Sequence, residues 1–484
     1  MDALTLGGTR AEPAGLAGSD NWPHTKRLTP WLLAAFLLML FVIPFEGITF
    51  KVHLPADATP DRLLLVAILV VQIFRSVAGG AKRHRRLGAI EVAVLVFTFV
   101  ALLSIVLNID RIYRLGQFPF VEKGFIQLLS YVVFFFIVAT TLRPQELRAF
   151  GKLILVLTSI TAIGTLYESR SGYNVFYVIW GKLLSPVAEV IPSPTNLHPG
   201  FGARPVIVGP TEHGLALASM LTIALPFAVV PLLAARRPSR RLAYLAIIGL
   251  IVAGSLSTAE KTAMLAPITA VGLLAVYRRQ LLRWAPLAVI VMIPVIHFAS
   301  PGALGSLKNL NPLAASGNYT DGRAGDYSAI APDIYSNLVI GRGYGSLNPL
   351  EWQWYRILDN QYLDELFNVG VLGLLSYLAL VLTAIGSAHR VIRRGGMRAP
   401  PALAAAAGCA AFGTVSATFD AMGYPQAIYS FLFVAGLIAV VAREQHEQRA
   451  APAPILTVPA NWGRLRVRAG SPARRTEPIE VSRV

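Results

Sequence analysis

The sequence predicts an all-α polytopic membrane protein with about twelve transmembrane helices. The chain has 484 residues, of which 55% are hydrophobic and only 14% charged, and its mean hydropathy is +0.57. This composition is too apolar for an ordinary soluble domain. The apolar residues form blocks of about 15 to 23 residues, long enough to cross a hydrocarbon core of about 30 Å. The blocks begin near Trp31, Leu63, Ala89, Ile126, Leu153, Leu215, Leu242, Ala263, Ala285, Val369, Ala402 and Ile428.

The blocks divide the chain into a transmembrane domain over residues 31–442 and two tails. No small-x-small cleavage site follows the first block, so we expect that block to remain as the first span behind an N-terminal tail, 1–30. Residues 443–484 are rich in Pro, Ala and Arg and lack an apolar period, which predicts a disordered basic tail. The single cysteine, Cys409, lies in an apolar run, so disulfide and thiolate-metal chemistry are not expected.

The basic residues predict the orientation. With both termini in the cytoplasm, the inside loops and tails hold most of the 43 lysines and arginines, in clusters such as RRPSRR at 236–241. Short basic loops on alternate sides of the spans are typical of the positive-inside rule. The net charge of +17 is therefore mainly an orientation signal. Since no soluble basic domain is evident, we expect no nucleic-acid partner.

Two predicted outer loops are much longer than ordinary connections. They cover about residues 168–213 and 299–365, and they mix aromatic residues with turn-forming ones. We expect WGKLLSPVAEVI at 180–191 and YSAIAPDIYSNLVI at 327–340 to form short helices that lie on the membrane face. Long loops of this kind commonly carry functional residues.

The candidate site residues are charged and polar groups of these loops and of nearby helix ends. An arginine can bind two phosphate oxygens at once, and a lysine supplies a point charge. A carboxylate or an imidazole can accept a hydroxyl proton. The cations are Arg204, Lys261, Arg323 and Arg342. The remaining candidates are Glu212, His213, Asp359 and Asn360.

These residues also have ordinary structural explanations. A lone arginine in a loop is commonly a surface residue or half of an ion pair. His213 could cap or pack, and Asp359 could be a plain helix cap at the start of the tenth span. In the functional reading, Asp359 and Asn360 face the reaction cavity from the first turn of this span, and Asp364 and Glu365 lie at the water boundary. The glycines of GRGYG at 341–345 are weak evidence for phosphate binding, because no Walker lysine-hydroxyl ending follows them.

The stretch from 322 to 373 resembles the O-antigen ligase and O-antigen polymerase family of bacterial membrane glycosyltransferases. It contains Gly-Arg at 322–323, then IGRGYGS at 340–346, and then Asn360 followed by nine residues and Gly370-x-x-Gly373. This order and spacing are similar to the family pattern. Asp359 stands where the family's ligases usually have histidine, which favours a polymerase over a lipid A-core ligase.

Two further stretches resemble the family more loosely. RPVIVGPTEHG at 204–214 is similar to the family's entry into a span, although Thr211-Glu212 replaces the common Asn. STAEKTAML at 257–265 is similar to a family corner, although Lys261 stands where arginine is usual.

The resemblance implies a C-type membrane glycosyltransferase-like fold and a metal-independent, inverting reaction without a cofactor. The donor would be a polyprenyl-pyrophosphate-linked glycan at the outer face of the cytoplasmic (inner) membrane, and the acceptor a second glycan. The four cations and Asn360 would bind the pyrophosphate and the substrate. Asp359, Glu212 or His213 would accept the hydroxyl proton or orient the acceptor. Membrane lipid and polysaccharide assembly and export proteins are the other partners that the resemblance implies.

Three alternatives remain open. A ligase would transfer the lipid-linked glycan to a different acceptor, and a non-catalytic scaffold would only organise a polysaccharide assembly complex. A transporter, either of lipid-linked oligosaccharides or of small solutes, would tend to place ionisable residues deep in broken spans and to show internal repeats. The sequence shows no convincing repeat, and Glu91 is among the few charged residues inside a block. These features favour the enzyme.

Overall fold

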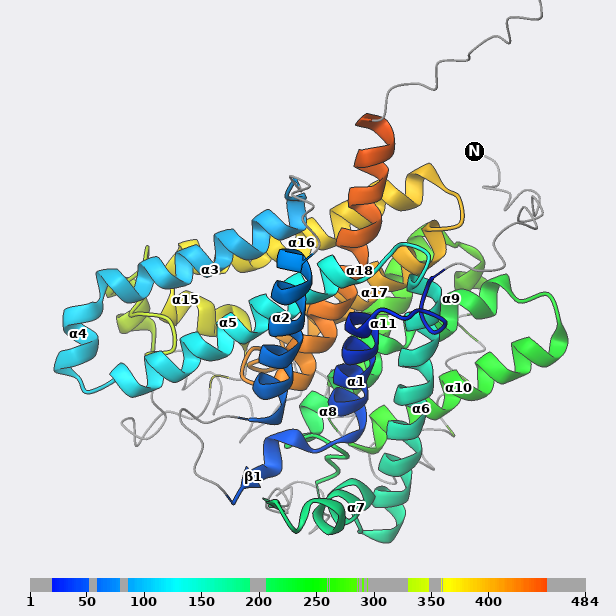
Figure 1. Ribbon diagram of the computed structural model, residues 1–484, viewed down its shortest axis with the longest axis horizontal. Helices are drawn as coiled ribbons and strands as arrows, with labels where there is room; N and C mark the ends of the chain where they lie inside the picture. Colours follow the sequence, from blue (N-terminus) through cyan, green and yellow to red (C-terminus); the bar gives the residue numbers. More distant parts are fainter. Residues whose placement is uncertain are drawn as a thin grey trace, which may run out of the picture. The chain divides into compact units, whose positions relative to one another are not determined.

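The computed structural model describes most of the chain as helices (Figure 1). The described ranges are 20–51, 59–78, 86–191, 206–258, 262–284, 330–347 and 360–450, with the single positions 260, 286, 290, 294 and 358.

Eight spans of the described chain are long and apolar enough to cross a membrane, which agrees with the predicted all-α polytopic membrane protein. They are α3 (Ala89–Leu107), α5 (Phe118–Thr141), α6 (Leu147–Ser171), the pair α8 (Gly214–Ala224) and α9 (Pro226–Ala234), α10 (Pro238–Ser257), α16 (Gly370–Arg394), α17 (Ala399–Ser416) and α18 (Pro425–Ala450).

Three more helices coincide with predicted apolar blocks. α1 (Leu28–Val42) and α11 (Thr262–Tyr277) are apolar but shorter than the eight spans, and α2 (Pro60–Ala78) is amphipathic. The block predicted to begin near Ala285 lies largely outside the described residues. The count of twelve spans therefore stays a prediction.

Proline and glycine explain several helix ends. Pro226 lacks a backbone N–H, so the helical ladder is interrupted between α8 and α9. Pro238 occupies the first turn of α10, where no N–H partner is needed. Gly172 ends α6 in the left-handed conformation, with a φ of 74°, and its N–H donates to the Glu168 carbonyl.

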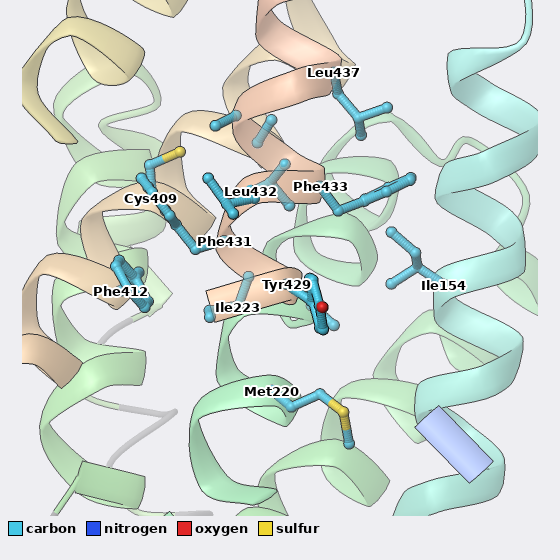
Figure 2. Close-up of a cluster of buried hydrophobic side chains, with 14 of the residues drawn as sticks. Ile154, Met220, Ile223, Cys409, Phe412, Tyr429, Phe431, Leu432, Phe433 and Leu437 are labelled. Atoms are coloured by element: carbon cyan, nitrogen blue, oxygen red, sulfur yellow. The ribbon is translucent and has the colours of Figure 1, made fainter. Parts of the chain in front are cut away.

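The core of the bundle forms around α18. Figure 2 shows Tyr429, Phe431, Leu432, Phe433 and Leu437 of α18 among side chains of α6, α8 and α17. A cavity of about 10 Å³ lies among α1, α6, α8, α9 and α18, and it is lined almost entirely by apolar side chains. Its volume is too small for any substrate larger than a single water molecule. On another side of the bundle, α3 packs between α5 and α16 (Figure 1).

Short elements connect the spans. α4 (Ile109–Arg114) follows α3, α7 (Val175–Leu184) follows α6, and α15 (Gln361–Asn368) precedes α16. After the 3₁₀ turn η1 (Phe45–Gly47), β1 (Ile48–Phe50) pairs antiparallel with β2 (Ala188–Val190), with Thr49 opposite Glu189.

Three predicted boundaries differ from the structure. The helix predicted over 180–191 is wrong in its second half, because Pro186 follows the end of α7 and residues 188–190 pair with β1. The helix predicted over 327–340 is observed over 330–336 and gives way to a turn. α18 continues through Ala450, beyond the predicted end of the last span, and 451–484 lie outside the described residues.

Candidate functional site

A break at Val369 separates α15 from α16. Gly370 adopts a φ of +75°, and a Cβ there would lie 2.5 Å from the carbonyl carbon of Val339. Gly341, with a φ of +72°, packs equally closely against the backbone of Asn368. The N–H of Gly343 donates to the Asn368 carbonyl at 2.9 Å. The GRGYG glycines thus allow one backbone to pack directly on another.

Asn360 is the N-cap of α15. Its side-chain oxygen accepts hydrogen bonds from the N–H groups of Tyr362 at 3.0 Å and Leu363 at 3.3 Å. Asparagine is among the best residues for this role. The capping considered for Asp359 is therefore performed by its neighbour, at the start of a short helix instead of a span. Asp359 itself lies outside the described residues.

The turn between α17 and α18, residues 417–424, is where several parts of the chain meet. The N–H of Gln361 donates to the Phe419 carbonyl at 3.2 Å, and the N–H of Met422 donates to the Gln361 side-chain oxygen at 2.7 Å. The hydroxyls of Thr262, at the start of α11, and Thr418 are 2.7 Å apart. Sequence analysis missed this turn, because its contacts are with distant parts of the chain.

His213 contacts the same turn from a different part of the chain, where it is the N-cap of α8. Its ring centroid is 5.6 Å from that of Tyr424, and its Nδ1 accepts a hydrogen bond from the N–H of Leu215 at 3.1 Å. A neutral imidazole that accepts at Nδ1 carries its proton on Nε2. As placed, neutral His213 therefore offers a hydrogen-bond donor on its other nitrogen, which suits orientation of an oxygen better than abstraction of a proton.

The loop before α8 is held by Glu168, a residue that sequence analysis did not select. The Glu168 carboxylate accepts from the N–H of Gly209 at 2.8 Å and from the Asn174 side-chain amide at 3.0 Å. The Thr211 hydroxyl donates to the Val208 carbonyl at 2.8 Å. These bonds fix the backbone that leads to Glu212 and His213.

Glu212 lies next to a second carboxylate, Glu46 in η1. The Glu46 carboxylate accepts a hydrogen bond from the backbone N–H of Glu212. The pKa of Glu46 is raised to about 8, chiefly by burial and also by the charges of Glu212 and Asp61. Burial also raises the pKa of Glu212, although Lys123 of α5 lowers it. Glu46 therefore holds a proton at neutral pH beside a carboxyl group whose proton affinity is also increased.

Asp61 extends this group of acids to α2. Tyr429 donates its hydroxyl proton to an Asp61 oxygen at 2.9 Å, and both side chains are buried. The sequence offered one sign of this arrangement, since Glu46 is a lone carboxylate directly after the first apolar block. Neither Glu46 nor Lys123 was selected from the sequence.

A further acidic group lies on α15. Glu365 is 0% exposed and accepts a hydrogen bond from the Gln361 side-chain amide at 3.0 Å. Burial raises the pKa of Glu365 to about 8. Burial also raises the pKa of Asp364, with further contributions from Asp420 and Glu365. The expectation that Glu365 lies at the water boundary is wrong, because α15 packs against the α17–α18 turn.

Among the four predicted cations, the structure describes only Arg342. Its guanidinium lies 3.0 Å from an Asp333 oxygen and above the Phe367 ring, 5.1 Å from the centroid, and the residue is 5% exposed. In this position Asp333 compensates the Arg342 charge, and the Arg342 side chain packs on Phe367 of α15. Four predicted site residues lie outside the described residues. They are the cations Arg204, Lys261 and Arg323 and the carboxylate Asp359.

Over the described ranges, no group of three or more His, Cys, Asp or Glu residues is arranged to hold a metal ion. Metal independence stays a prediction. No protein-family model and no curated protein matches the chain.

Proposed function

We propose that the protein polymerises polyprenyl-pyrophosphate-linked oligosaccharide repeat units into a cell-surface polysaccharide. In this proposal twelve spans cross the cytoplasmic membrane, both termini are cytoplasmic, and the α17–α18 turn lies at the outer face. The substrate class comes from the family resemblance. The observation that supports the proposal is that three separate stretches with this resemblance converge on one turn.

Each of these stretches contacts the turn between α17 and α18. The stretch 360–373 reaches the turn through Gln361 and Met422, and the stretch 204–214 reaches it through the rings of His213 and Tyr424. The stretch 257–265 reaches it through Thr262 and Thr418. A Cβ at Gly214 would also lie 3.4 Å from a Glu260 oxygen, which joins the last two stretches directly. Three sequence patterns that act in one reaction must converge in this way.

The proposed reaction is a single displacement. An acceptor hydroxyl oxygen bonds to the anomeric carbon of the donor while the bond from that carbon to the pyrophosphate oxygen breaks, which inverts the carbon. The hydroxyl proton passes to Asp359 or Glu212. Arg204, Lys261 and Arg323 stabilise the charge on the departing pyrophosphate. His213 orients the acceptor oxygen through its Nε2 proton.

A deletion strain tests the proposal. Accumulation of single repeat units on the lipid carrier would support a polymerase. Long chains that stay on the carrier would indicate a ligase instead. Glycans of normal length on the cell surface would contradict both.

Buried carboxylates favour one second candidate, a lipid-linked oligosaccharide transporter. Asp61 and Glu46 each have a buried oxygen that lacks a hydrogen-bond partner among the described residues. Buried acids of this kind are typical of proton-coupled carriers. Purified protein in detergent micelles separates the two, because an enzyme can elongate lipid-linked glycans there, whereas a carrier needs two compartments.

A further inference from the structure

α7 has an exposed apolar face that the proposed reaction does not use. Phe176 and Tyr177 are buried on one side of this helix. On the other side, Val178, Ile179 and Leu183 are 46%, 48% and 62% exposed. A helix that contacts only water would be expected to have a polar outer face.

The contacts of α7 place it level with the ends of two helices of the bundle. The Phe176 ring packs closely against Gly164 of α6, and the Trp180 indole N–H donates to the carbonyl of Val42, the last residue of α1, at 3.0 Å. Gly164 lies about 10 Å inside the end of α6 at a rise of about 1.5 Å per residue. Figure 1 shows α7 beside this end of α6. α7 therefore lies alongside the last turns of α6.

The exposed side of α6 is also apolar. Val156, Ile160, Ile163 and Tyr167 are exposed at helical spacing along this membrane-spanning candidate. Apolar side chains on the outside of a membrane span contact lipid. α7 follows α6 directly after the turn at Gly172, so its exposed apolar face lies close to the end of this surface.

We propose that α7 is an interfacial helix whose Val178, Ile179 and Leu183 side chains insert into the membrane leaflet at this end of α6. Lys182 is exposed on the same side of α7, where its aliphatic stem can lie among acyl chains while its ammonium group reaches the lipid phosphates. Amphipathic helices with this arrangement bind in the plane of the membrane interface. The exposed apolar side of the neighbouring span α6 favours lipid as the occupant over a second copy of the chain.

This contact has a consequence for the neighbouring loop. The Tyr177 hydroxyl donates to the Thr211 carbonyl at 3.2 Å, directly before Glu212. A membrane-bound α7 would hold that loop near the level of the lipid headgroups. The inference itself does not depend on the proposed function.

Spin labels on single introduced cysteines test the inference in lipid vesicles. The native Cys409 is the chain's only cysteine and is fully buried, so it provides an unreactive background. The test positions are Ile179→Cys and Leu183→Cys. Ile163→Cys on α6 is the lipid control, and Glu189→Cys, exposed on β2, is the water control.

We expect the labels at 179 and 183 to be more accessible to oxygen than to a water-soluble nickel chelate, as at 163. The label at 189 should show the opposite order. Labels at 179 and 183 that behave like the label at 189 would overturn the inference. So would labels shielded from both reagents with spin-spin broadening, which would indicate a second copy on this face.

Discussion

The side-chain oxygen of Gln361 accepts a 2.7 Å hydrogen bond from the backbone N–H of Met422. The amide nitrogen of the same fully buried side chain donates to Glu365 at 3.0 Å. One amide thus joins the first turn of α15 to the turn between α17 and α18. This bond helps to explain how a short polar helix before α16 is fixed against the rest of the site.

Gln361→Ala should destabilise the protein by about 1–3 kcal/mol, because it leaves the buried Met422 N–H without its acceptor. Gln280→Ala, at an exposed helical position, is the matched control and should stay within about 0.5 kcal/mol of the wild type. Chemical unfolding in detergent micelles measures both. Equal stability of the two variants would show that the Gln361 bond is unimportant.

Gly370→Ala should destabilise the protein by more than about 1 kcal/mol, because alanine is strained at a positive φ and its Cβ would meet the Val339 backbone. Gly386→Ala, farther along α16, has open space around the new Cβ. Alanine should therefore be neutral or stabilising at 386. Thermal unfolding measures the stability of both variants. A Gly370→Ala variant as stable as the wild type would contradict the observed packing.

The sequence predicts the spans better than the site, and Val369 illustrates the reason. Hydrophobicity correctly locates an apolar block there, but composition cannot reveal that Gly370 turns the backbone between two helices. Asn360 matched a family spacing, yet its capping bonds depend on where α15 begins. Glu46 and the α17–α18 turn were missed because their partners are far away in the sequence. Local patterns carry no information about such contacts.

Stability should fall as the pH rises from about 5 to about 8. Burial raises the pKa of Glu46 and Glu365 to about 8 each, whereas a glutamate in an unfolded chain has a pKa of about 4.3. Between these values the folded protein binds more protons than the unfolded chain, so raising the pH favours unfolding. The apparent melting temperature in micelles measures this dependence.

Glu46→Gln and Glu365→Gln should each flatten that dependence, because glutamine mimics the protonated acid and does not titrate. Glu189→Gln, at an exposed strand position, should leave it unchanged. Identical pH profiles for all three variants would show that neither buried acid holds its proton through this range.

Arg323 and Arg342 should respond differently to substitution. Arg342→Lys should reduce stability, because lysine retains the charge near Asp333 but loses the planar group above Phe367.

If Arg323 binds pyrophosphate, Arg323→Lys should impair turnover strongly with stability preserved, and Arg323→Ala should cost on the order of 100-fold or more in rate. Melting temperature and glycan elongation by reconstituted protein separate the two effects. An Arg323→Ala variant within about twofold of wild-type activity would leave Arg323 as a surface residue.

Asp359→Asn and Glu212→Gln should identify the base. Asn360 already caps α15, so the Asp359 substitution tests chemistry with little effect on capping. Loss of a general base typically costs about 10²- to 10⁴-fold in rate, while each amide preserves size and should leave membrane insertion intact.

If only Asp359→Asn is inactive, Asp359 accepts the proton and Glu212 orients the acceptor. If only Glu212→Gln is inactive, the roles are exchanged. Full activity in both variants, with normal amounts of protein in the membrane, would mean that neither carboxylate takes part in the reaction.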